Sequence, residues 1–354
     1  MEDIESLMRT AGVVVVLLMA VLLLRDAGRG LVGGLGALFS LGVASYLVCS
    51  APGFRELSPF IHLPLLSLCV SNPVFFWLLA RALFDDAFRL APVHGLLVVV
   101  LLLGKAACAL AGGTIAATGG LLIQATGFGL AGHALWVAYA GRADDLSEER
   151  RAVRLPLVVG VGVYSVVILV GELIVGTGIA PAPVRLIHVG IILSLAVAFA
   201  LRLVSLRADD LLVPQSTAPQ LSDAARQDRD IDAALLGRLN ALMEQQETWR
   251  AEGLTIGKLA DQLGIPEYRL RRLINKRLGH RNFSSYINGY RIEAARRALK
   301  DPAKARLPVL TIALDLGFGS IGPFNRAFKD ATGMTPTEFR RAHRGAEGNN
   351  LAES

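Results

Sequence analysis

Between residues 268 and 306 the chain carries twelve basic residues against two acidic ones, Glu293 and Asp301. A solvated helical face normally mixes both signs, so this one-sided excess suits a polyanionic partner. Duplex DNA is the first candidate, and anionic lipid headgroups are the alternative. The basic residues are Arg269, Arg271, Arg272, Lys276, Arg277, Arg281, Arg291, Arg296, Arg297, Lys300, Lys304 and Arg306.

The stretch LGFGSIGPF suggests a different chemistry, because Gly317, Gly319 and Gly322 match the pattern G-x-G-x-x-G. In a dinucleotide-binding fold a β-strand precedes these glycines. Here the preceding residues, TIALDL, keep a helical spacing of apolar side chains. The sequence therefore predicts a turn between two short helices and no nucleotide site.

No arrangement of residues in the sequence is typical of an enzyme. The three cysteines, Cys49, Cys69 and Cys108, lie in apolar runs and lack metal-ligand spacing. We find no phosphate-binding loop and no Ser, His and Asp in a catalytic order. We therefore expect no catalysis, no cofactor and no bound metal.

Two helix pairs are expected to position the basic residues. The segment LTIGKLADQLGIPEYRLRRLINKRLG predicts a helix that ends at Gly264 and a second helix from about Pro266. The segment VLTIALDLGFGSIGPFNRAFKDATG repeats this plan, with a turn at Gly317 and Ser320 as N-cap. The second helix of each pair, here called the reader helix, carries the candidate DNA-binding residues. They are Tyr268, Arg269, Arg271, Arg272, Asn275 and Lys276 in the first pair, and Ser320, Asn325, Arg326 and Lys329 in the second.

The N-terminal part of the chain is apolar, and the whole chain has a mean hydropathy of +0.48. A helix needs about 20 mostly apolar residues to cross a bilayer. Seven segments qualify, and because the first and fourth are short, six is the alternative count. The segments are 8–24, 30–50, 61–80, 95–111, 119–140, 156–177 and 185–205.

The connections between these segments predict the orientation. Ten Lys or Arg residues fall on one side and four on the other, and the richer side is normally cytoplasmic. The N-terminus is then outside, and the chain after residue 207 is in the cytoplasm. We expect a multi-pass protein of the cytoplasmic membrane, in contact with its lipids.

Ionisable residues inside membrane segments are functional candidates. Lys105, Glu172 and His188 fall towards the outer ends of their segments and are the candidate signal-receiving group. The alternative is that they only fix packing through a Glu–Lys or Glu–His pair.

These features predict an all-α chain with four parts. Residues 1–207 form the transmembrane domain and residues 208–230, with two prolines, a linker. Residues 231–345 form the basic helical domain, and residues 346–354 a disordered tail.

The basic domain closely resembles the DNA-binding domain of the AraC/XylS transcription regulators, over about a third of the chain. The closing run GFGSIGPFNRAFKDATGMTPTEFR is the most specific part of the match. The matching residues are Leu259-Ala260, Gly264, Leu270, Arg272, Leu273, Gly279, Tyr286, Arg291, Ala295, Ile312-Ala313, Gly317-Phe318, Phe324, Arg326, Phe328-Lys329, Gly333, Thr335-Pro336 and Phe339-Arg340.

The resemblance implies two helix-turn-helix units joined by a long helix, here NFSSYINGYRIEAARRAL, and binding to bacterial promoter DNA. Familiar members carry a soluble ligand-binding β-barrel where this chain has membrane segments. We therefore expect a membrane-anchored regulator that senses an unknown small-molecule or membrane signal, as a monomer or a homodimer. The alternatives are a transporter or channel with a basic docking tail, and a membrane-bound enzyme such as a sensor kinase.

Overall fold

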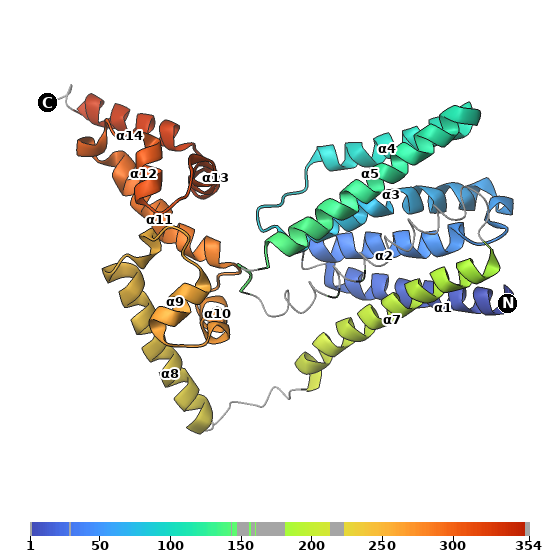
Figure 1. Cartoon of the computed structure of the whole chain (residues 1–354), viewed down its shortest axis with the longest axis horizontal. Helices are drawn as coiled ribbons and strands as arrows, with labels where there is room; N and C mark the ends of the chain where they lie inside the picture. The colour runs from blue at the N-terminus through green and yellow to red at the C-terminus, as the bar shows by residue number, and fades with distance from the viewer. Residues whose placement is uncertain are drawn as a thin grey trace. The chain divides into compact units, whose positions relative to one another are not determined.

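Figure 1 shows the computed structural model of the chain, which describes residues 2–27, 30–142, 144–146, 156, 160, 181–212 and 223–350. These residues form two compact units. Unit 1 comprises Met1–Arg142 and Glu149–Ser216, and unit 2 comprises Ala143–Glu148 and Thr217–Ser354. In the described parts every regular element is a helix, and the one β pairing is an isolated bridge between Asp145 and Asn282. The all-α prediction is confirmed.

Unit 1 contains six described helices that are long and apolar enough to cross a membrane. They coincide with six of the seven segments expected from hydropathy. The remaining segment, 156–177, lies outside the described residues except for positions 156 and 160. The helices are α1 (Glu2–Ala27), α2 (Leu31–Cys49), α3 (Pro59–Phe84), α4 (Pro92–Ala111), α5 (Gly113–Ala140) and α7 (Ala182–Leu212).

Glycines let neighbouring helices of unit 1 approach closely. A Cβ atom on Gly42 of α2 would collide with the side chain of Asn72 of α3, and one on Gly36 would lie 3.1 Å from Leu23 of α1. Small residues at helix contacts are typical of membrane bundles, where lipid is as apolar as the side chains. Large apolar side chains point outward instead, including Phe60 (91% exposed) and Leu110 (89% exposed). Apolar surface of this extent is typical of a membrane or partner contact.

Unit 2 contains the two expected helix pairs. The first is α9 (Ile256–Leu263) with α10 (Glu267–Lys276), and the second is α12 (Val309–Asp315) with α13 (Ile321–Thr332). The long helix α11 (Phe283–Lys300) joins them, α8 (Asp223–Asn240) precedes them, and α14 (Pro336–Asn350) follows.

The helices extend further than the sequence indicated. Helix α7 continues to Leu212, two residues before Pro214, and α8 begins at Asp223, so both enter the 208–230 segment that we expected to be a linker. Helix α14 continues to Asn350, into the segment expected to be a disordered tail.

One apolar core runs through unit 2. Leu259, Leu263 and Leu270 are fully buried in the first helix pair, as their spacing predicts. In the second pair, Phe324 packs against Phe318 and Phe328 with ring centroids 5.2 and 5.7 Å apart. Such offset and edge-to-face aromatic pairs add stability beyond the area that they bury.

Candidate nucleic-acid interface

The turn of the first helix pair, between α9 and α10, is fixed by residues with distinct roles. The Thr255 hydroxyl accepts the Lys258 backbone N–H at 3.3 Å and so caps the start of α9. Gly264 ends α9 with φ 65°, a left-handed conformation that glycine adopts without strain. Pro266 occupies the N-cap of α10, so the reader helix starts immediately after a rigid turn.

The exposed face of α10 carries four of the expected residues. Tyr268, Arg272 and Lys276 are exposed and follow each other at four-residue spacing, which places them on one stripe of the helix. Arg269 lies half-buried beside them. The Asn275 amide instead donates to the His280 carbonyl at 3.0 Å and holds the turn before α11. The stripe offers an aromatic ring and two cations to a polyanion.

Arg271 lies elsewhere than the sequence suggested. Arg271 is 4% exposed. Its guanidinium donates to the Glu267 carboxylate, and to the Asp145 carbonyl at 2.6 Å. Both of these acceptors hold it inside unit 2 in this conformation. Asp145 lies 126 residues away in the chain, so helical spacing alone cannot reveal the contact.

The second reader helix presents a different chemistry. Asn325, Arg326 and Lys329 of α13 are exposed. Ser320 is the N-cap residue as expected, but its hydroxyl makes no capping hydrogen bond and is exposed. The first turn that follows is Ile321-Gly322-Pro323, which has no side-chain donor or acceptor.

Arg291 of α11 shows that some of the basic residues between 268 and 306 stabilise the fold. Its Nε donates to the Trp249 carbonyl at 2.7 Å, and its Nη2 donates to the Ala251 carbonyl at 2.9 Å. The guanidinium lies 5.3 Å from the Phe318 ring. Burial lowers the pKa of Arg291 from its usual value. This arginine therefore ties the segment before α9 to the second helix pair.

Of the candidate signal-receiving group, the structure describes Lys105 and His188, which lie on different helices. Lys105 is exposed on α4, and His188 lies on α7. Helix α7 packs on α1, whereas α4 packs on α3 and α5, and no described contact joins the two residues. Glu172 lies outside the described residues.

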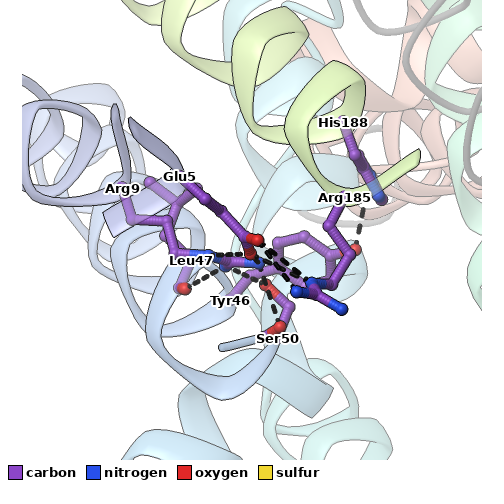
Figure 2. A network of polar contacts seen from close by, with 7 residues as sticks. All are labelled: Glu5, Arg9, Tyr46, Leu47, Ser50, Arg185 and His188. Carbon is purple, nitrogen blue, oxygen red and sulfur yellow. Dashed lines mark hydrogen bonds and ion pairs between the residues drawn. The ribbon is translucent and has the colours of Figure 1, made fainter. Parts of the chain in front are cut away.

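His188 instead borders a buried ionic network, shown in Figure 2. Its Nε2 lies 3.4 Å from the Tyr46 hydroxyl. Glu5, 3% exposed, is shared by Arg9 at 2.8 Å and Arg185 at 3.1 Å. Arg9 also donates to the Leu47 carbonyl at 2.7 Å and to the Ser50 hydroxyl and carbonyl. The network joins α1, the end of α2 and the start of α7.

Sequence reasoning missed this network, although part of the signal was present. Glu5 and Arg9 stand at i, i+4 spacing, which favours an ion pair on one helix face. Nothing in the sequence indicates that Arg185 joins them. Among the described residues, no group of three or more His, Cys, Asp and Glu side chains could hold a metal ion.

Two reader helices with exposed basic side chains, each behind a left-handed glycine turn and joined by one long helix, define a double helix-turn-helix protein. The family described as a helix-turn-helix domain matches residues 259–342. The chain is 30% identical over 104 residues to the probable transcription factor PqrA of Proteus vulgaris, across 29% of this chain and 82% of that protein. The chain belongs to the AraC-type family of DNA-binding transcription regulators through this C-terminal domain.

Other similarities cover the same part of the chain. The uncharacterized transcriptional regulatory protein YesN of Bacillus subtilis is 33% identical over 104 residues, across 25% of this chain and 27% of that protein. The match thus spans about a quarter of the length of YesN. The C-terminal domain of AraT, a response regulator from Geobacillus stearothermophilus, is 26% identical with a TM-score of 0.28, over 35% of this chain and 88% of that chain.

Proposed function

We propose that this chain is a transcription regulator anchored in the bacterial cytoplasmic membrane, which receives a signal through unit 1 and binds promoter DNA with unit 2. The observation that carries the proposal is the exposed stripe of Tyr268, Arg272 and Lys276 on α10, in a chain that also has six apolar helices. Their outward-facing apolar side chains suit contact with lipid tails. The chain acts by binding, without catalysis.

The contacts inside unit 1 support an odd number of membrane crossings. Glu5 near the start of α1 pairs with Arg185 near the start of α7, so these helices begin at the same end of the unit. Ala138, in the last turn of α5, lies in the cluster against which Phe199 of α7 packs. Helix α5 therefore ends at the end of unit 1 opposite the start of α7. An odd number of crossings, in which the first and last helices run in the same direction, requires this arrangement.

The full-length chain in nanodiscs of neutral lipid should bind a fluorescent DNA duplex, with an affinity that falls steeply as salt rises. Each neutralised phosphate releases a counterion, so six or more contacts should cost about a thousandfold or more between ~50 and ~200 mM salt. Fluorescence anisotropy across a salt series measures this slope. Neutral lipid removes competing anionic headgroups. Capture of the basic domain by anionic vesicles, with no duplex bound at low salt, would favour a transporter or channel with a docking tail.

Signal reception is assigned to the network around Glu5. Ionisable groups within membrane helices are costly unless they pair or face a cavity, so a change at one of them moves its partners. Glu5 is the carboxylate that Arg9 and Arg185 share in Figure 2. A ligand or lipid that altered this balance would shift α7 against α1, and α7 leads towards unit 2 in the sequence.

Glu5→Gln should change the signal response of a reporter gene placed behind DNA selected for binding to this chain. The neutral amide leaves the buried Arg9 and the partly buried Arg185 without the charge of Glu5, at a cost of about 1–3 kcal/mol. His188→Ala should alter the response in the same assay. Lys105→Gln, on exposed α4 surface, is the matched control and should leave it unchanged. A normal response in Glu5→Gln would remove the network from signal reception.

A further inference from the structure

Three residues from the segment after α5 are built into the DNA-binding unit. Asp144, Asp145 and Leu146 belong to unit 2, although the sequence places them immediately after the apolar helix α5. The Leu146 N–H donates to the Arg281 carbonyl at 3.0 Å, and the Phe283 N–H donates to the Asp144 carbonyl at 2.8 Å. These paired bonds form the isolated β bridge at the start of α11. We call residues 144–146 the clasp.

Side chains strengthen this attachment. Leu146 is 1% exposed and lies in the apolar core that α8 to α14 share. The Ser284 hydroxyl donates to the Asp144 carboxylate at 2.7 Å. Such complete burial of a leucine contributes roughly 1.5–3 kcal/mol relative to exposure. The clasp is therefore a specific docked segment of the chain.

The clasp also accepts a hydrogen bond from a basic side chain of the first reader helix. The Asp145 carbonyl accepts from Arg271 at 2.6 Å, and Arg271 is the buried member of the expected DNA-binding set. Asp144 keeps an exposed carboxylate on the same unit. A negative charge on the unit that binds phosphates weakens its attraction for DNA, because like charges repel.

We propose that the clasp is an internal inhibitor of the first helix-turn-helix unit, which the membrane part releases to free Arg271 for DNA. The proposal rests on the proposed function above. Asp144 follows the end of α5 at Ala140 by four residues, so α5 is the membrane helix that precedes the clasp in the chain. The apparent affinity for DNA is then reduced by the fraction of molecules with the clasp docked.

Weakening the clasp should tighten DNA binding. The variants Ser284→Ala and Asp144→Ala remove one exposed hydrogen bond and leave the apolar core untouched. In full-length chain held in neutral-lipid nanodiscs, each should bind a fluorescent random-sequence duplex more tightly, on the order of tenfold if docked molecules outnumber open ones by that factor. Ser285→Ala, at the next exposed position of α11, is the control for Ser284→Ala. Asp261→Ala on exposed α9 surface is the control for the lost charge.

The controls decide the outcome. Affinities of Asp144→Ala and Ser284→Ala that match those of Asp261→Ala and Ser285→Ala, or fall below them, would overturn the inhibitory role. Failure of every form, wild type included, to bind duplex at low salt would instead overturn the proposed function. The two failures are therefore distinguishable in one titration series.

Hydrogen exchange provides a direct measurement of release. In the DNA-free chain the amides of Leu146 and Phe283 should exchange slowly, because both donate within the bridge. A saturating duplex should accelerate both, while the Ile265 amide, which donates to Ala260, should stay protected. Unchanged protection of Leu146 and Phe283 in the DNA complex would show that binding does not open the clasp.

Discussion

Replacing Gly317 with alanine should disrupt the second helix-turn-helix unit. Gly317 has φ 83°, where a side chain is strained. A Cβ atom there would also collide with the backbone carbonyl of Arg250 and would lie 2.8 Å from Nη2 of Arg291. The collision forces apart the contacts by which Arg291 holds Trp249 and Ala251. We expect a loss of about 3 kcal/mol or more, because strain and a backbone clash add.

Two other glycines separate strain from collision. Gly264 has φ 65° but no atom near its would-be Cβ, so Gly264→Ala should show the strain alone, about 1–2 kcal/mol. At Gly319 the new Cβ would lie 3.3 Å from the carboxylate of Glu252, the mobile end of a long side chain. Gly319→Ala should therefore cost least. Hydrogen exchange of the Phe318 amide measures the loss of stability in all three variants. Equal losses in Gly317→Ala and Gly264→Ala would refute the collision.

The helix-turn-helix pairs could be predicted because their signals are local. Gly264 and Gly317 end helices with left-handed backbone, and the leucine and phenylalanine spacing around them defines each small core. The apolar helices of unit 1 could be predicted for a similar reason, since length and hydropathy alone decide whether a segment is able to span a membrane.

The placement of individual side chains depended on contacts between distant segments. Arg271 has the same spacing as an exposed reader residue, and its contact with the distant Asp145 could not be read from that spacing. Lys105 and His188 looked alike in the sequence because both lie near predicted outer ends. The order in which helices pack is not encoded in hydropathy, and it separates α4 from α7.

The two reader helices should read DNA unequally, and Arg272 should carry base preference. Arg272 is exposed on α10, and a bidentate Arg–guanine contact discriminates between bases by about 1–3 kcal/mol. Arg272→Ala should therefore relax the base preference at one DNA position beneath α10, as measured by selection from a random-sequence pool. Arg272→Lys is the matched control, because it keeps the charge but loses the planar fork. It should keep the salt slope and lose the preference.

The second reader helix should instead hold the DNA backbone. The side chains of its first turn, Ile321-Gly322-Pro323, offer only apolar contact to thymine methyl groups. The Ser320 hydroxyl precedes this turn and makes no capping hydrogen bond. Lys329 is exposed on the same helix, and Lys329→Ala should weaken binding to all sequences alike and reduce the salt slope by about one. Sharper base preference beneath α13 than beneath α10 in the selected pool would show that the two reader helices have the opposite roles.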